Sequence, residues 1–316
     1  MQLQLEKLNW LKANFYVPLI GGYFLIVLLT YIYFGVLLQS ALGVISLALL
    51  PLTIFLGRAK EYLRDWSPFL ALLLSYEALQ GIAGSLANSR GIVSIYPIDR
   101  MLWGMNLTGQ IQLAFYSDAL TDVATTLYSL HFPLVAILAT LLWYMNKLHF
   151  RGYVYALLIS SYFSLMVFLV MPTAPPWYVG VASDIIAKPS SASTNLVPFF
   201  STIDGLTKSI ESDKFAAFPS LHAAYALLFG YYATRLKPIY GLVAIPITVG
   251  ILFSTLYLGQ HYLIDLIGGG LVALSAIIIS NKVVGRAATS TGRSKAMEPA
   301  LSSINGQDSA GSNSPL

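Results

Sequence analysis

Long apolar runs separated by short polar segments dominate the chain. A helix that crosses a bilayer needs about 20 mostly apolar residues, and eight runs approach or reach that length. They cover residues 15–38, 41–56, 67–86, 126–145, 153–171, 216–234, 239–258 and 262–280. The second run is short, contains Pro51 and follows the first almost directly, so the first two are expected to form a hairpin. The pattern predicts an all-α polytopic membrane bundle of about eight transmembrane helices.

Composition supports the same class of protein. Of the 316 residues, 56% are hydrophobic and 10% are charged, and mean hydropathy is +0.69, whereas a soluble domain carries about 25% charged residues. The 18 basic and 14 acidic side chains cannot cover a water-soluble globule of this size. The chain has no cysteine, which excludes disulfides, thiolate metal sites and a cysteine nucleophile. No dense basic patch points to a nucleic-acid partner.

The distribution of Lys and Arg predicts the orientation, because cytoplasmic loops of membrane proteins are enriched in basic residues. With the N-terminus in the cytoplasm, the inner side receives 13 of the 18 basic residues. The outer side receives only Arg90, Arg100, Lys188, Lys208 and Lys214. Eight spans then place both termini in the cytoplasm.

Three regions are expected along the chain. Residues 1–66 would form an N-terminal transmembrane hairpin, and residues 67–286 a membrane core of six helices. Residues 287–316 are rich in Ser, Gly, Ala and Thr, which predicts a disordered cytoplasmic tail.

Two long outer loops, 87–125 and 172–215, separate spans of the core. The first contains apolar and aromatic residues at 101–103 and 111–115. This content favours a helix lying in the membrane interface, with an ordinary loop packed on the bundle as the alternative.

Five titratable residues lie inside the apolar runs, where ionisable groups are costly and therefore candidates for function. They are Glu77, His131, His222, His261 and Asp265. On the expected topology Glu77 lies in mid-span, and the other four lie near the outer ends of their spans. Because the orientation rests on basic residues alone, this clustering is independent of it and indicates one site near the outer or luminal surface.

Spacing around these residues suggests a chemistry. His261 and Asp265 are four residues apart and share a helix face, so the carboxylate can accept the proton of one imidazole nitrogen and leave the other as nucleophile or base. His222 follows Pro219 and Ser220, a helix-start signal, and the free N–H groups of a helix start favour an anion. Together they predict phosphoryl transfer through a covalent phosphohistidine.

Other interpretations of the same residues stay open. His261 and Asp265 alone could relay protons, or could hold a metal with His222 as a third ligand. His131 could form a hydrogen bond between helices, and Glu77 could bond a neighbouring Ser or Tyr.

Two motifs resemble those of a known family. The segment FPSLH at 218–222 resembles the second motif of the type 2 phosphatidic acid phosphatase superfamily. The third motif of that superfamily is similar to the series Ser254, His261, Tyr262 and Asp265.

Further segments are similar to one branch of that superfamily, the inositol phosphorylceramide synthase branch of the aureobasidin-resistance type. One is PTAPPWY at 172–178. A second consists of Asp122, Tyr128 and the triplet His131-Phe132-Pro133. A third consists of Glu77, Arg90 and the triplet Pro97-Ile98-Asp99. The resemblance covers roughly residues 67–281.

The resemblance implies a role for each matching residue. His261 would attack phosphorus, Asp265 would orient and activate it, and His222 would protonate the leaving alkoxide. Ser220 and the adjacent backbone would contact phosphate. Other matching positions would bind substrate, namely Glu77, Asp99, Tyr128, His131 and Trp177.

The chain departs from the superfamily pattern mainly where cations are expected. The first motif, a Lys followed by Arg-Pro, is not visible, and Thr255 stands where an arginine follows the serine of the third motif. Leu221 replaces the usual glycine of the second motif. Because a transferring phosphoryl group needs cationic stabilisation, Arg90 and Lys214 are the predicted substitutes.

The leading hypothesis is an integral-membrane phosphotransferase. It would move a phosphorylated head group, such as phosphoinositol, from a phospholipid donor to the hydroxyl of a lipid acceptor such as ceramide or diacylglycerol. No metal or other cofactor is expected.

Two alternatives are kept. A lipid phosphate phosphatase would use the same histidines with water as acceptor, although Leu221 and the segment 172–178 favour transfer, since a lipid acceptor needs a drier site. A proton-coupled transporter belongs to another class, and the clustering of titratable groups at one surface and the lack of an apparent inverted repeat argue against it.

Overall fold

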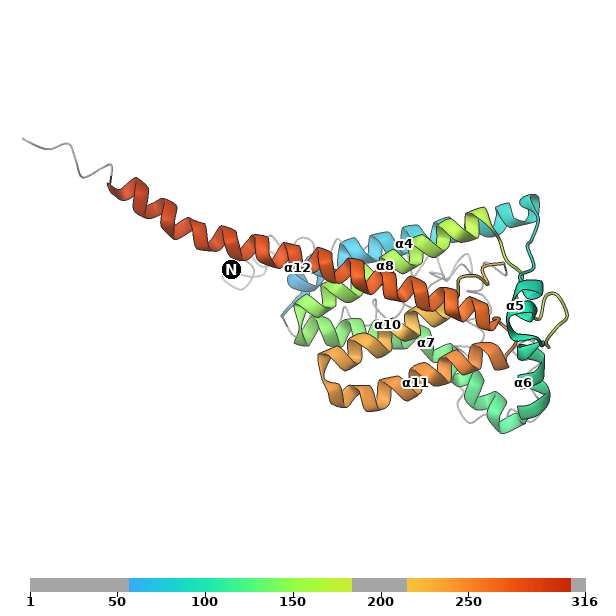
Figure 1. Ribbon diagram of the computed structural model, residues 1–316. Coiled ribbons are helices and arrows are strands. Elements are labelled where there is room, and N and C mark those ends of the chain that lie inside the picture. Colours follow the sequence, from blue (N-terminus) through green and yellow to red (C-terminus); the bar gives the residue numbers. More distant parts are fainter. Residues whose placement is uncertain (1–56, 184–214, 308–316) are drawn as a thin grey trace, which may run out of the picture.

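The computed structural model describes residues 57–183 and 215–307, and all the regular elements of this part of the chain are helices. They are α4 (Ala59–Arg90), α5 (Tyr96–Trp103), α6 (Leu107–Phe115), α7 (Asp118–Met145), α8 (Lys147–Val170), α10 (Leu221–Leu236), α11 (Pro238–Tyr257) and α12 (Leu263–Gln307). Six of them run alongside one another, while the short α5 and α6 lie across one end of the bundle (Figure 1). For this part of the chain the all-α prediction is confirmed.

Three of the described helices are long and apolar enough to cross a membrane, namely α8, α11 and the part of α12 over Leu263–Arg286. On α11 the outward side chains are large, apolar and more than half exposed: Ile239, Leu242, Val243, Ile245 and Val249. So broad an exposed apolar surface is expected to contact lipid rather than water. The three helices coincide with the predicted spans 153–171, 239–258 and 262–280.

Within the described residues, the other predicted spans do not coincide with a helix that is long and apolar enough to cross a membrane. The runs 67–86, 126–145 and 216–234 lie in or overlap α4, α7 and α10, while 15–38 and 41–56 lie outside the described residues. The total of eight spans therefore stays a prediction.

Two helix boundaries differ from those expected. The helix predicted from residue 216 begins only at Leu221, because Ser220 caps it by accepting a hydrogen bond from the Ala223 N–H at 3.2 Å. At the other end of the core, α12 continues as a helix to Gln307. Residues 287–307 of this helix belong to the segment predicted as a disordered tail, and the division of the chain into three regions stays a prediction.

The centre of the bundle is formed by α8 and α10, each of which packs against three or more other helices. Aromatic side chains fill much of the space between them, with Tyr153 and Tyr232 fully buried and their ring centroids 5.2 Å apart. Buried hydroxyls pair across helices, as Ser161 does with the Tyr225 hydroxyl at 2.6 Å. Side-chain hydrogen bonds of this kind join helices where lipid cannot supply partners.

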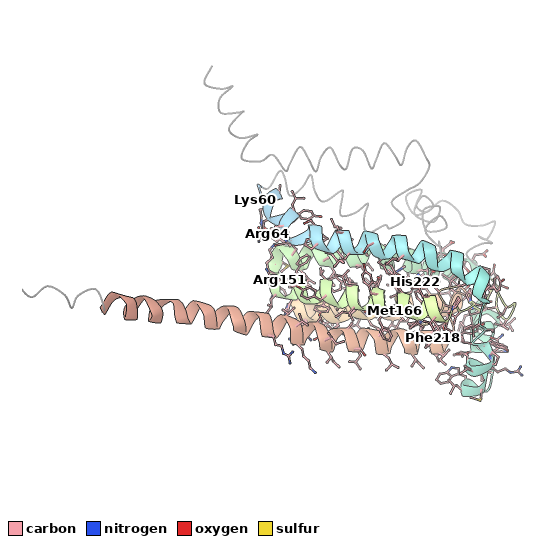
Figure 2. The ribbon with its side chains drawn as sticks, turned by 90° about the horizontal axis from the view of Figure 1, so that it is seen from above. Lys60, Arg64, Arg151, Met166, Phe218 and His222 are labelled. Atoms are coloured by element: carbon pink, nitrogen blue, oxygen red, sulfur yellow. The ribbon has the colours of Figure 1, made fainter. Side chains whose placement is uncertain are left out.

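Basic side chains gather at the end of the bundle opposite α5. Lys60, Arg64 and Arg151 lie there, whereas His222 lies toward the other end (Figure 2). The same end holds a partly buried ion pair, in which Asp65 Oδ2 accepts hydrogen bonds from Lys147 Nζ at 2.7 Å and from the Trp143 indole at 3.0 Å. Burial raises the pKa of Asp65, but the hydrogen bonds from Lys147, Trp143 and Arg64 outweigh burial and hold it below its usual value.

The two short helices expose apolar side chains at the opposite end. Met101 on α5 is 76% exposed and Leu113 on α6 is 80% exposed, while Phe115 is also exposed. Their position across the end of the bundle places them where an interfacial helix was predicted.

Candidate active site

The starts of α10 and α12 meet at the end of the bundle near α5. The Ser220 N–H donates to the main-chain oxygen of Asp265 at 3.0 Å, which ties the cap of α10 to the first turn of α12. The helices approach so closely that a Cβ atom at Gly269 would lie 2.2 Å from the Ser220 oxygen. A glycine at this position permits the contact that brings the two histidine segments together.

His261 and His222 face each other across this junction. His261 Nε2 lies 3.2 Å from His222 Nδ1, and the ring planes cross at 61°. His261 is in the turn that precedes α12, and His222 is the second residue of α10. The prediction that these two residues and Asp265 converge matches this arrangement.

The other nitrogen of His261 has two acceptors. Nδ1 lies 3.0 Å from the main-chain oxygen of Ala217 and 3.4 Å from Asp265 Oδ2. Both atoms are acceptors only, so Nδ1 carries the proton of the neutral ring. The lone pair of His261 is consequently on Nε2, the atom that faces His222.

Asp265 is itself fixed by the backbone. Its Oδ2 accepts a hydrogen bond from the Tyr262 N–H at 2.8 Å, and its side chain is fully buried. The carboxylate therefore has a defined position behind His261.

Ala217 is held in place by a segment that matches none of the histidine motifs. Thr173 receives the Ala217 N–H on its main-chain oxygen at 3.4 Å and the Phe218 N–H on its hydroxyl at 2.7 Å. The segment around Thr173 is held in turn by Val93, which donates its N–H to the Pro172 oxygen and accepts the Ala174 N–H. The segment 172–178 thus supports the carbonyl that accepts the His261 proton, a role that the sequence did not reveal because a main-chain carbonyl leaves no mark in the sequence.

His222 packs between two side chains of α7. Its ring stacks on Tyr128 at a centroid distance of 4.4 Å and contacts the ring of His131 at 4.0 Å. His131 Nδ1 lies 2.7 Å from the Tyr128 main-chain oxygen, so this nitrogen carries the proton. Both α7 residues contact His222, and their predicted contact with substrate stays a prediction.

Two other predicted substrate residues support the turn at His261 from outside. Trp177 donates its indole N–H to Gln260 Oε1 at 3.1 Å. Asp99 is buried on α5, where Oδ1 accepts hydrogen bonds from the Ile264 N–H and the Trp103 indole, each at 3.1 Å. Burial raises the pKa of Asp99 above its usual value, although these two hydrogen bonds limit the rise.

The remaining predicted residues are not described in detail. Lys214 lies outside the described residues, and only the backbone of Glu77 and Arg90, both in α4, is described. The source of cationic stabilisation for a phosphoryl group stays a prediction. In residues 57–183 and 215–307 no group of three or more His, Asp or Glu side chains is arranged to hold a metal ion.

The fold and the site together define a helical membrane protein with a buried pair of histidines at one end of its bundle and a carboxylate behind one of them. Comparison of the sequence with known protein families identifies one family. The PAP2 superfamily matches residues 94–279, and the chain belongs to that superfamily. The resemblance drawn from the histidine motifs is confirmed.

Curated relatives lie in the branch that the motifs indicated. The catalytic subunit aur1 of inositol phosphorylceramide synthase from Schizosaccharomyces pombe is 27% identical over 129 residues, which is 38% of this chain and 30% of the relative. The inositol phosphorylceramide synthase of Candida albicans is 25% identical over 193 residues, covering 58% and 41%. The chain thus spans less than half the length of these two relatives.

A bacterial relative aligns more completely. The phosphoinositol dihydroceramide synthase of Bacteroides thetaiotaomicron is 27% identical over 221 residues, which cover 64% of this chain and 71% of the relative. No solved structure matches the chain.

Proposed function

We propose that this protein is a membrane phosphotransferase that moves the phosphorylated head group of a phospholipid to the hydroxyl of a second lipid through a phosphohistidine on His261. The observation that carries the proposal is the His261 ring, protonated at Nδ1 by its contacts with Ala217 and Asp265 and facing His222 with the lone pair of Nε2. The names of the relatives support phosphoinositol as the head group and a ceramide as the acceptor.

In the first half-reaction, His261 Nε2 attacks the donor phosphorus. A bond forms between nitrogen and phosphorus while the bond from phosphorus to the glycerol oxygen breaks, and protonated His222 gives its proton to that oxygen, releasing diacylglycerol. Asp265 stabilises the positive charge that develops on the imidazole as it becomes phosphorylated.

In the second half-reaction, neutral His222 takes the proton of the acceptor hydroxyl. The acceptor oxygen attacks phosphorus, the bond to His261 breaks, and the lone pair returns to Nε2. The site starts the next cycle with His222 protonated and His261 neutral.

Substrate must separate the two rings before reaction. A phosphorus atom poised for attack sits about 3–3.5 Å from its nucleophile, and the leaving oxygen must lie about 2.6–3.2 Å from the acid. The two nitrogens are only 3.2 Å apart without substrate, so the head group has to enter between them. Ser220 can then donate its hydroxyl proton to phosphate while its oxygen still caps α10.

Burial favours a lipid acceptor over water. His261 is 5% exposed, and Ser220 and Asp265 are fully buried. A phosphohistidine formed here would be reached more readily by a hydroxyl delivered from the bilayer than by bulk water. Hydrolysis, as in a lipid phosphate phosphatase, remains the second outcome of the same first half-reaction.

The distribution of charge supports an orientation. The end with Lys60, Arg64 and Arg151 would face the cytoplasm under the positive-inside rule. The histidines would then face the outer or luminal leaflet, with α5 and α6 in its interface, and both termini would be cytoplasmic.

One assay tests the proposal. The purified protein is incubated with phosphatidylinositol labelled in its head group, with and without ceramide. A labelled lipid that forms only with ceramide supports transfer, whereas labelled inositol phosphate or phosphate released into water would identify a hydrolase. Turnover retained after His261→Ala would refute the mechanism.

A further inference from the structure

Asp99 occupies an unusual position for a residue expected to bind substrate. It is 1% exposed, although it lies on α5, a short helix at the surface of the bundle. Its Oδ1 accepts one hydrogen bond from Trp103 on the same helix and one from the Ile264 N–H at the start of α12. The carboxylate thus caps a helix that is distant in the sequence.

The turn that Asp99 caps is the one that carries His261 and Asp265. Ile264 directly precedes Asp265 and follows His261 by three residues. A helix leaves its first N–H groups without intrahelical partners, and a carboxylate near them also interacts favourably with the helix dipole. Here two carboxylates share them, since Asp265 Oδ2 takes the Tyr262 N–H and Asp99 Oδ1 takes the Ile264 N–H.

The position of this turn matters because Asp265 Oδ2 makes two contacts, and its contact with His261 is the longer one. Oδ2 lies 2.8 Å from the Tyr262 nitrogen but 3.4 Å from His261 Nδ1. Without Asp99, the first turn of α12 loses the hydrogen bond that holds the Ile264 N–H, one residue before Asp265. A small movement of this turn would change the 3.4 Å distance between the Asp265 carboxylate and His261 Nδ1.

We propose that Asp99 is a positioning residue, which holds the Ile264 N–H and thereby keeps the Asp265 carboxylate within reach of His261. The proposal rests on the proposed function of the His261 site. It assigns α5 a part in the reaction without requiring that Asp99 touch the substrate.

The chain offers a matched control at the opposite end of the bundle. Asp65 is also a largely buried carboxylate that accepts a hydrogen bond from a Trp indole, that of Trp143 at 3.0 Å. It joins α4 to α8 rather than to α12. Loss of Asp65 should therefore lower stability without changing the rate of the folded enzyme.

The experiment compares Asp99→Ala, Asp99→Asn and Asp65→Ala in purified protein, with His261→Ala as reference. Head-group transfer from phosphatidylinositol to ceramide gives kcat and KM, and thermal unfolding gives stability. Asp99→Ala should lower kcat about 10-fold or more, because the turn that positions Asp265 behind His261 would lose its acceptor, with KM within about twofold. Asp99→Asn keeps a carbonyl acceptor and should recover most of kcat, whereas Asp65→Ala should change only the unfolding temperature.

Three results would overturn the proposal: an unchanged kcat in folded Asp99→Ala, a raised KM with unchanged kcat, which would mark Asp99 as a substrate ligand, or an Asp99→Asn variant as slow as Asp99→Ala. If Asp99→Ala does not fold, Asp99→Ser, too short to reach Ile264, takes its place under the same criteria. Activity retained by His261→Ala would instead refute the proposed function, so the two failures are distinguishable.

Discussion

Replacing Asp265 by Asn isolates the charge behind His261. The amide oxygen can keep the bond from the Tyr262 N–H, because its NH2 group can occupy the position of Oδ1, a buried atom with no hydrogen-bond partner in the described part of the chain. What is lost is the negative charge 3.4 Å from His261 Nδ1.

The size of the loss follows from the second acceptor of His261. In Ser-His-Asp proteases the same change costs about 10⁴-fold, because the carboxylate alone fixes the tautomer. Here the Ala217 oxygen lies closer to Nδ1, at 3.0 Å, and holds the tautomer without Asp265. Only a charge-assisted hydrogen bond of about 1.5–3 kcal/mol is removed, which corresponds to a rate reduction of about 10- to 150-fold.

The assay is head-group transfer from labelled phosphatidylinositol to ceramide by purified Asp265→Asn. Ser280→Ala is a control on the same helix, since it removes hydrogen bonds to the Tyr232 hydroxyl and to the Ile277 main-chain oxygen, both away from the histidines. A loss near 10⁴-fold would show that Ala217 does not hold the tautomer. An unchanged rate would show that Asp265 does not act on the reacting ring.

Three further predictions concern the framework of the site. Gly269→Ala places a Cβ 2.2 Å from the main-chain oxygen of Ser220 and should lower both transfer activity and the unfolding temperature, at a cost of about 1–3 kcal/mol. Gly270→Ala meets only an ordinary contact at 3.6 Å and should lower neither. Equal effects of the two changes would contradict the close approach of α10 and α12. Ser220→Ala should destabilise the protein by about 1 kcal/mol in thermal unfolding, and Ser220→Thr, which keeps the cap, should lose much less. Because the pKa of Asp65 is lowered in the folded protein, its contribution to stability should be constant above about pH 4 and decline as the pH falls below that value; Lys147→Met should reduce this acid dependence of the unfolding temperature, and an unaltered profile would contradict the ion pair.

Side-chain patterns were sufficient to predict the centre of the site. The four-residue spacing of His261 and Asp265 placed them on one face, and the distribution of Lys and Arg placed His222 at the same end of the bundle. Both inferences use local periodicity or a property summed over loops, and neither requires knowledge of how helices pack. The structure brings these residues together as expected.

The supporting contacts could not be predicted in the same way. The Ala217 carbonyl that fixes the His261 tautomer comes from a loop 44 residues away in sequence, and main-chain atoms are the same at every position. The resemblance marked Asp99 and Trp177 as candidates for substrate contact, but it could not show that their side chains are bonded to Ile264 and Gln260. Such contacts depend on how α5 and the segment 172–178 pack against the start of α12.

The most direct test of the mechanism is to identify the covalent intermediate. The protein is mixed with phosphatidylinositol labelled at phosphorus, without acceptor, quenched with base, digested and analysed by mass spectrometry. Phosphohistidine is stable in base and labile in acid, so the label should survive the quench, lie on His261, be lost in acid and disappear when ceramide is added before quenching. A label on His222, or no label on His261 in a preparation that transfers the head group, would contradict the assignment of His261 as nucleophile.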